Sequence, residues 1–353
     1  MVSVSELFEG NALESAVSAG LVRSQTAVVA NKELTIYKYT DKCVFERSWD
    51  SVTKTCRGLI VDNSGVVYSR PFKKFLNLSE LSGEELAKVE SQRGVVLDKL
   101  DGTCIQMFFM PEDGQWHFAT LGSLDNEYID EAIELYHELY AHDWSPIPGF
   151  TYVFELISPV SRIVVNYEGA RKLVLLGKVD IASGVEYAPG DVSEWVFERP
   201  AEFGMLSTNE VSLLPVRANA EGYVVVFGDG SKVKMKLAEY LRLHKLRFNL
   251  SPKHVWRLLA REGLSGDELI ASFPEEFRDE VEPIVVGFVR KFERLRVGLE
   301  EVWDEARSAG YRDRELYEFC GVRGLSASQT AVVMRLSRGM QIDFSRLWSD
   351  IQP

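Results

Sequence analysis

The sequence predicts an α+β domain followed by an all-helical C-terminal domain. Up to about residue 248, short apolar and β-branched runs alternate with glycine-containing turns, as at residues 56–68 and 221–237. This pattern is typical of antiparallel strands joined by hairpins. Beyond that point strand signals become sparse, and apolar residues recur at helical spacing. We therefore assign residues 1–248 to the first domain and residues 249–353 to the second.

The composition is that of an ordinary globular protein. Of the 353 residues, 46% are apolar and 26% are charged. No apolar run approaches the length of a membrane span, and residues 1–10 do not resemble a signal peptide. The four cysteines and five histidines are scattered, without metal-ligand spacing, which argues against structural zinc and for a reducing compartment. We expect a cytoplasmic monomer without a membrane partner.

Apolar periodicity predicts the elements of the first domain. Helical spacing covers residues 4–18 and 126–142, and two prolines end the second of these helices. Residues 56–62 and 66–68 form a hairpin around a turn that contains glycine. Further strands are predicted at residues 33–39, 94–97, 103–109, 115–120, 152–157, 173–179, 221–227 and 232–237.

Helix signals dominate the second domain. Ser251 and Pro252 suit an N-cap and a first helical position, and they open a helix over residues 253–261. Residues 275–309 carry one long apolar stripe. We expect Pro283 to interrupt this helix near its start, because proline lacks a backbone donor. Two shorter helices are predicted at residues 314–320 and 326–336.

The most informative stretch follows the strand at residues 94–97. Lys99 and Asp101 are two residues apart, so on a continuing strand they would face the same side and share one pocket. Gly102 would let the backbone turn or a ligand approach closely. A lysine amine held beside a carboxylate is a candidate covalent nucleophile. On its own, such a short pattern is usually a solvated turn.

Other charged residues also lie on or beside predicted apolar strands. Each could be a surface charge or a member of a structural ion pair, but together they require a shared polar cleft. These residues are Arg57, Glu155, Glu221, Lys234 and Lys236. The net charge of −13 argues against a nucleic-acid partner, yet residues 231–247 carry six basic residues against one acid. Local charge therefore leaves a nucleic-acid partner open.

Taken in order, these residues resemble the covalent nucleotidyltransferase superfamily of ligases and capping enzymes. Four segments look like its motifs I, III, IV and V, namely Lys99-Leu100-Asp101-Gly102, Phe154-Glu155-Leu156, Glu221-Gly222-Tyr223 and Lys234-Met235-Lys236. More closely, the chain is similar to the ATP-dependent RNA ligase 1 family of T-even bacteriophages. That likeness also rests on residues 56–58, 69–78 and 158–164, and on Tyr240, Leu243 and His244.

The resemblance implies a nucleotidyltransferase domain of ATP-grasp-like antiparallel sheets with flanking helices. It implies that Lys99 attacks the α-phosphate of ATP, that AMP then passes to an RNA 5′-phosphate, and that a 3′-hydroxyl displaces it. The implied catalytic residues are Lys99, Asp101, Lys234 and Lys236. The implied nucleotide-binding residues are Arg57, Lys74, Lys99, Glu155, Glu221, Lys234 and Lys236. Mg²⁺, with Mn²⁺ as a substitute, would bind through Glu221 and Glu155.

One position departs from the family pattern. Leu121 stands where the phage member has a lysine before a Gly-Ser pair. One phosphate contact is therefore either missing or supplied from elsewhere, with Lys73 and Lys172 as the candidates. The expected partners are RNA ends, with cleaved tRNA as one candidate, and a separate end-healing kinase-phosphatase. The helical domain would help to select the RNA, although solvated helix charges are the better interpretation of its arginines Arg323, Arg335 and Arg338.

Two alternatives remain at this stage. A DNA ligase or an mRNA capping enzyme usually follows motif V with a β-barrel, whereas the sequence here reads as helix from residue 251 onward. A non-catalytic RNA-binding module would be expected to have lost the charged motif residues, and all of them are present. Covalent labelling by ATP and not GTP would exclude a non-catalytic module and a capping enzyme, and ligation of matched RNA and DNA ends distinguishes a DNA ligase from an RNA ligase.

Overall fold

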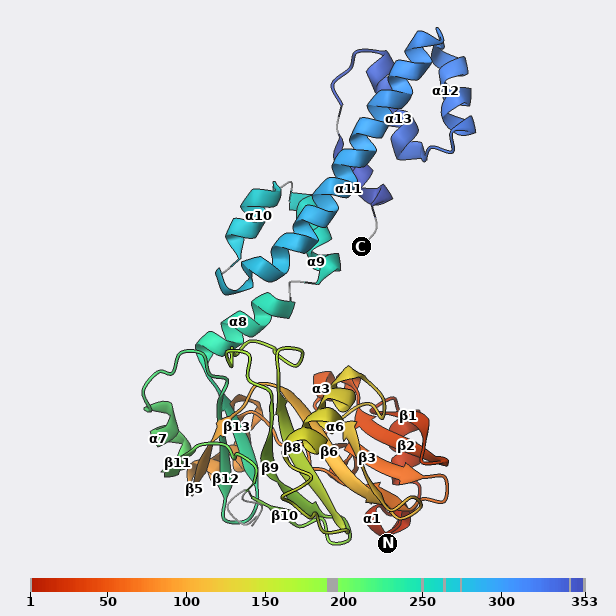
Figure 1. The fold of residues 1–353 in the computed structure, drawn as a ribbon. Helices are drawn as coiled ribbons and strands as arrows, with labels where there is room; N and C mark the ends of the chain where they lie inside the picture. The colour runs from red at the N-terminus through yellow and green to blue at the C-terminus, as the bar shows by residue number, and fades with distance from the viewer. Residues whose placement is uncertain are drawn as a thin grey trace. The chain divides into compact units, whose positions relative to one another are not determined.

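The computed structural model describes residues 2–188, 196–248, 251–262, 265–273, 275–342 and 344–351. The chain forms two compact units, Met1–Leu241 and Arg242–Pro353, and each is described by itself (Figure 1). The helix α8 (Ala238–Phe248) contains the division between them. The predicted boundary near residue 248 lies at the end of the same helix.

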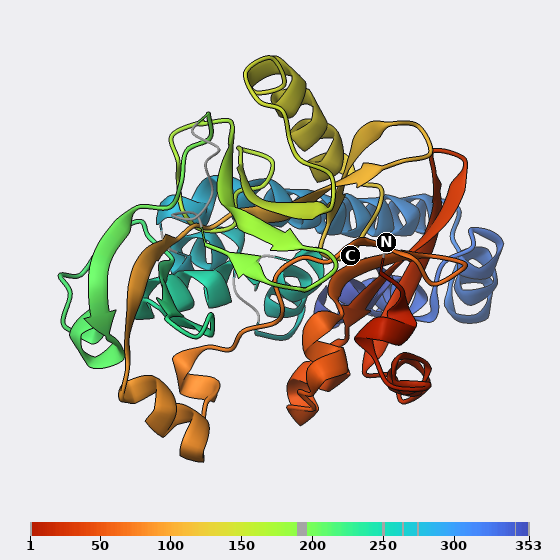
Figure 2. The same cartoon turned by 90° about the horizontal axis from the view of Figure 1, so that it is seen from below.

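The strands described in the first unit form three sheets with antiparallel neighbours. The first sheet has the order β1 (Val22–Val29), β2 (Lys32–Tyr39), β3 (Arg57–Asp62) and β4 (Val67–Ser69). The second has the order β10 (Glu186–Tyr187), β9 (Lys172–Asp180), β8 (Phe150–Ile157), β6 (Thr103–Met110) and β7 (Gln115–Thr120). The third has the order β11 (Glu202–Ser207), β5 (Arg93–Lys99), β12 (Gly222–Phe227) and β13 (Lys232–Lys236). The five-stranded sheet lies between the other two (Figures 1 and 2).

The N-terminal helical pattern is divided in the structure. Instead of one helix over residues 4–18, the chain forms α1 (Val4–Leu7) and α2 (Ala12–Ser18). Gly10 has a φ of +51° between them, a conformation that glycine adopts without the steric cost of a side chain. The helices α3 (Asp41–Glu46) and α4 (Ser51–Thr55) then connect β2 to β3.

Aromatic and aliphatic side chains fill the core between the central sheet and helix α6 (Glu127–Leu139). Tyr152 and Phe154 of β8 are fully buried there, and Trp144 packs edge-on against both rings. The third sheet has a separate core around Val96, Tyr223 and Val225. The helices α5 (Gly83–Glu90) and α7 (Thr208–Ser212) and the 3-10 turn η1 (Leu78–Glu80) complete this unit.

The second unit consists of helices in the part that the structure describes. These are α9 (Pro252–Arg257), η3 (Leu258–Glu262), α10 (Gly266–Ser272), α11 (Glu275–Ser308), α12 (Asp313–Val322), α13 (Ala327–Ser337) and η4 (Phe344–Asp350). Ser251 caps α9 by accepting a hydrogen bond from the His254 backbone, with Pro252 at the first position, as predicted. The predicted interruption at Pro283 is wrong, because α11 continues through it. Burial of Val281, Val285 and Phe288 outweighs the one backbone hydrogen bond that proline removes.

The α+β fold class and the helical C-terminal region are thus confirmed. The four cysteines are free thiols. Within the described residues, no helix is both long enough and apolar enough to cross a membrane.

Candidate active site

Strand pairing in the third sheet brings motifs I, IV and V together. Gly222 is the register partner of Lys99 on β5 and of Lys236 on β13. The preceding residue, Glu221, therefore lies between the two lysines. Its Oε2 is 2.6 Å from Nζ of Lys99 and its Oε1 is 2.9 Å from Nζ of Lys236. The Glu221 side chain is only 4% exposed, so both oxygens are satisfied by ion pairs inside the protein.

Glycine is required beside this carboxylate. Gly222 has a φ of +152°, and a Cβ there would lie 2.2 Å from the carbonyl oxygen of Met235. In motif I, a Cβ on Gly102 would lie 2.3 Å from the carbonyl oxygen of Leu156. Both glycines thus permit close approach of two backbones, which is what places the motif residues around one cavity.

Lys99 lines a pocket between the central and third sheets. Apolar side chains from four strands form part of its wall, and polar groups are confined to a few positions. The lining includes Arg57, Phe72, Phe75, Leu97, Lys99, Cys104, Glu155, Leu176, Val224, Val226, Lys232 and Lys234. An apolar cavity with a few convergent charged groups is the usual form of a small-molecule site. The aliphatic residues of β5, β9 and β12 supply walls suited to a flat base, a feature that the sequence did not identify.

Glu155 reaches this pocket from β8. Burial raises the pKa of its carboxyl to about 8, with Glu221 and Asp101 adding to the effect and Lys99 and Arg57 opposing it. No hydrogen bond or ion pair from another described residue satisfies its side chain. A buried carboxyl without a partner is costly, and Glu155 is therefore a candidate ligand for a cation or a hydroxyl.

Lys234 is a half-buried cation that lines the same pocket. Its pKa is lowered to about 6, first by burial and then by the positive charges of Lys74, Arg57, Lys99 and Lys236. Its Nζ lies 4.9 Å from the centre of the Phe75 ring, and the guanidinium of Arg57 lies 5.6 Å from the same ring. These cations converge without a carboxylate bonded to either in the described structure, an arrangement suited to a strongly anionic ligand.

Two further lysines have different surroundings. Nζ of Lys74 lies outside this pocket, over the rings of Tyr39 and Trp49, at 5.2 and 5.1 Å from their centres. It lines an adjoining pocket together with Lys54 and Lys73. The third lysine of β13, Lys232, pairs with Glu186 at 2.5 Å, so its charge is compensated within the protein.

The Asp101 side chain makes different contacts from the Lys99 side chain. Strand β5 ends at Lys99, so the two-residue alternation that predicted a shared pocket does not extend to Asp101. Its Oδ2 accepts hydrogen bonds from the backbones of Val164 and Val165 at 2.7 and 2.8 Å, and its Oδ1 accepts one from the Tyr240 hydroxyl at 2.7 Å. The carboxylate is 2% exposed. It ties motif I to the loop after β8 and to helix α8.

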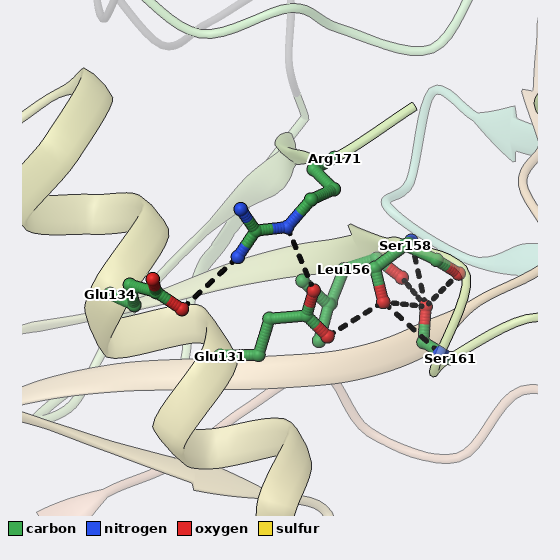
Figure 3. Close-up of polar contacts among 6 residues, drawn as sticks. All are labelled: Glu131, Glu134, Leu156, Ser158, Ser161 and Arg171. Carbon is green, nitrogen blue, oxygen red and sulfur yellow. Dashed lines mark hydrogen bonds and ion pairs between the residues drawn. The ribbon is translucent and has the colours of Figure 1, made fainter. Parts of the chain in front are cut away.

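That loop is anchored by serines on the helix side of the central sheet. The Ser161 hydroxyl donates to the carbonyl of Leu156 at 2.8 Å, and the Ser158 hydroxyl donates to Glu131 of α6 at 2.7 Å (Figure 3). Arg171 pairs with the same Glu131 and with Glu134 (Figure 3). The serines belong to residues 158–164, so this stretch supports the site through the bonds of Asp101.

Some contacts had no local signal in the sequence. Asp98 forms a two-pronged ion pair with Arg217 at 2.8 and 3.1 Å, and 119 residues separate the partners. Leu121, where the family has a lysine, lies against Gly58 next to Arg57. Of the two lysines expected to replace it, Lys172 pairs with Glu198 at 2.5 Å, and Lys73 lines the adjoining pocket.

Comparison with known proteins identifies the family. A family model described as RNA ligase matches residues 55–240. The chain is 24% identical to an RNA ligase of Rhodothermus phage RM378 over 320 residues, 69% of this chain and 72% of that protein. It is 30% identical to the "Putative RNA ligase" of Thermovibrio ammonificans over 193 residues, 51% of this chain and 50% of that protein. A solved archaeal ATP-dependent RNA ligase has a TM-score of 0.49 and 15% identity, covering 94% of this chain and 96% of its own. Because the family model covers more than half of the chain and contains Lys99, Glu155, Glu221, Lys234 and Lys236, the protein is an enzyme of the RNA ligase family.

Proposed function

We propose that the protein is an ATP-dependent RNA ligase that joins 5′-phosphate and 3′-hydroxyl ends through lysyl-AMP and RNA-adenylate intermediates. The observation that carries the proposal is the position of Lys99. Its Nζ is at the edge of a pocket with apolar walls, paired with Glu221 and surrounded by other cations. A nucleophile, an acceptor for its proton and charges for a phosphate are thus in one place.

The first step uses the pair of Lys99 and Glu221. Transfer of a proton from the Lys99 ammonium to Oε2 of Glu221, 2.6 Å away, leaves a neutral amine. Its nitrogen attacks the α-phosphorus of ATP, the N–P bond forms, and the bond to the bridging oxygen breaks. The pyrophosphate that leaves takes up the second proton of the nitrogen. Hydrogen-bond reach between the nucleophile and its base is the geometry that this chemistry requires.

Charge on the transferring phosphate would be stabilised by the other cations of the pocket. Lys234 and Arg57 have no carboxylate bonded to them in the described structure, and Lys236 shares Glu221 with Lys99. When the Glu221 carboxylate takes a proton, its hold on Lys236 weakens and this lysine becomes available to the phosphate. Lys74 would act from the adjoining pocket.

The side chains of the pocket provide few ligands for a divalent cation. Among the described residues, no three potential metal-ligating side chains form a cluster. Mg²⁺ commonly binds through one or two carboxylates, several waters and substrate phosphates, and Glu155 offers one unpartnered carboxyl at the pocket. We propose Glu155 as the first ligand of Mg²⁺ or Mn²⁺, and Glu221 in its ionised form as the second. The ion would supply charge neutralisation at the phosphates.

The proposal extends to RNA repair. Family resemblance makes cleaved tRNA a candidate substrate, with a separate kinase-phosphatase preparing its ends, and the protein acting as a cytoplasmic monomer. The second unit would contribute to selection of a structured RNA. The described part of this unit is helical, unlike the β-barrel that usually follows motif V in DNA ligases and capping enzymes.

The test is a pair of assays on the full chain. Incubation with ATP or GTP labelled at the α-phosphate is expected to transfer label from ATP alone. Sealing is then compared on matched RNA and DNA ends presented as linear, stem-loop and nicked substrates, with RNA sealed faster than DNA. Absence of a covalent protein–AMP species would overturn the proposed mechanism, and a preference for DNA ends would overturn the substrate.

A further inference from the structure

Three cations form a row across the first sheet. Arg23 of β1 is the register partner of Lys38 on β2, and Lys38 is the register partner of Arg57 at the start of β3. Like charges at opposed positions of an antiparallel sheet repel each other and destabilise it. In the described structure, no carboxylate forms a hydrogen bond or ion pair with any of the three. We call Arg23, Lys38 and Arg57 the cation row.

The cation row converges on the turn after β7. A Cβ added to Gly122 would lie 3.1 Å from Nζ of Lys38 and 3.2 Å from a terminal nitrogen of Arg23. On the other side of the same turn, a Cβ on Gly58 would lie 3.1 Å from the Cα of Leu121. The ends of Arg23 and Lys38 are therefore held against the Leu121-Gly122 backbone, where the lack of a side chain on Gly122 leaves room for them.

The position of the Lys38 charge is energetically unfavourable. Lys38 is half-buried, and its pKa is lowered by burial first and then by the charges of Arg23 and Arg57. The charge of Asp41 opposes this lowering without bonding to Lys38. A half-buried cation without a bonded counter-charge is unfavourable, so the row favours an anion. One end of the row, Arg57, also lines the pocket that contains Lys99. The anion would therefore sit at the edge of the candidate active site.

We propose that Lys38, at the centre of the cation row, binds a phosphate group of a substrate beside the Leu121-Gly122 turn. The inference rests on the proposed ligase function for its substrates, and it assigns the phosphate contact to β2 rather than to Lys73 or Lys172. The shared chemistry is a multiply charged phosphate, either the diphosphate tail of ATP or the 5′-phosphate of an RNA end. Two or more basic side chains that meet one phosphate suit this recognition.

The experiment compares Lys38→Met, which removes the charge, with Lys38→Arg, which keeps it. Lys42→Met is the matched control, because Lys42 is an exposed lysine of α3 that bonds only to the carbonyl of Ala19 among the described contacts. Three quantities are measured: the ATP concentration dependence of protein–AMP formation, the sealing of chemically pre-adenylated RNA, and calorimetric binding of inorganic tripolyphosphate. Thermal unfolding of each variant verifies that it is folded.

Lys38→Met is expected to weaken tripolyphosphate binding by about ten- to a hundred-fold, the effect of losing one charge-assisted hydrogen bond, while Lys42→Met leaves it unchanged. A matching rise in the ATP concentration needed for labelling identifies the ATP tail as the ligand. A loss confined to sealing of pre-adenylated RNA identifies the RNA phosphate. The proposal is overturned if folded Lys38→Met equals the wild type in all three measurements, or if Lys38→Arg loses as much as Lys38→Met. Failure of the wild type to label would instead contradict the ligase function, and the tripolyphosphate comparison would still decide the role of Lys38.

Discussion

Nζ of Lys99 lies 2.6 Å from Oε2 of Glu221, although 122 residues separate the two in the sequence. The contact joins the end of β5 to the start of β12, which are paired along their whole length. Lys236, at the end of β13, contacts the other oxygen of the same carboxylate. One buried carboxylate therefore fixes both lysines.

The first prediction tests this arrangement with Glu221→Gln. We expect protein–AMP formation at saturating ATP and Mg²⁺ to fall by at least about a hundred-fold, the usual size for loss of one key polar group at such a site. The amide keeps the shape of the side chain but cannot accept the proton of Lys99. Lys99→Ala should form no protein–AMP at all.

Glu198→Gln is the control for this prediction, because the exposed Glu198 pairs with half-buried Lys172 and does not line the pocket. It should label like the wild type. If Glu221→Gln also labels at the wild-type rate, Glu221 is not the acceptor of the proton. Label on Lys99→Ala would mean that another residue is the nucleophile.

The motif residues could be located from the sequence because strand periodicity is local. The hairpins at β3–β4 and β12–β13 and the strand before Lys99 follow from alternating apolar residues and turn glycines. Strands β1 and β11 carry mostly exposed or half-buried residues, so they lack the apolar pattern that would reveal them.

Contacts that depend on strand register could not be predicted. The cation row arises only once β1, β2 and β3 are aligned, and Asp101 is separated from Tyr240 by 139 residues. The continuation of α11 through Pro283 likewise depends on tertiary burial, which outweighs the local preference of proline.

The second prediction concerns Lys234, whose pKa is lowered to about 6 in the free protein. At roughly pH 7.5 the Lys234 amine is neutral in most molecules. Bound phosphate favours its charged form, so ATP binding should be accompanied by uptake of a proton. For the same reason, affinity for ATP should decrease as pH rises above this pKa. Calorimetry in buffers of different ionisation enthalpy measures the uptake directly. Lys234→Met should abolish it, and proton release by the wild type would contradict the assignment.

The third prediction concerns stability. Glu155 has a pKa of about 8 in the folded protein against an ordinary value of 4.5. Between these values the folded state holds a proton that the unfolded state has lost. The contribution of this group to the free energy of unfolding therefore falls as pH rises through that window, by up to ~1.4 kcal/mol per pH unit.

Glu155→Gln removes this dependence and keeps the shape of the side chain. Urea unfolding should show the variant gaining stability over the wild type between roughly pH 5 and pH 8. The Glu198→Gln variant should show no such trend. A difference between Glu155→Gln and wild type that stays constant with pH would mean that Glu155 is ionised in the folded protein.

The fourth prediction separates positioning from catalysis at Asp101. Asp101→Asn should destabilise the protein by about 1–3 kcal/mol, because buried donors from the loop or from Tyr240 lose a charged acceptor. Protein–AMP should still form at a reduced rate, in contrast to Lys99→Ala. Tyr240→Phe removes one donor, and a double-mutant cycle with Asp101→Asn should show coupling. If the two substitutions change the free energy of unfolding additively, the hydrogen bond between Tyr240 and Asp101 does not contribute to stability.

The last prediction concerns which unit is needed for adenylation and which for RNA selection. Residues 1–248 contain the pocket, the cation row and all of α8, so Tyr240 keeps its bond to Asp101 in this fragment. The sheets have their own buried cores within the first unit. We therefore expect the fragment to form protein–AMP within a few-fold of the full chain. A fragment that ends at residue 237 lacks Tyr240 and should unfold at a lower temperature and label more slowly.

Sealing of RNA tests the second unit. Relative to the full chain, the fragment of residues 1–248 should lose more activity on a stem-loop RNA than on an unstructured RNA. Equal losses on both RNAs would mean that the second unit does not select structured RNA. If the fragment of residues 1–248 is folded but forms no protein–AMP, adenylation requires both units.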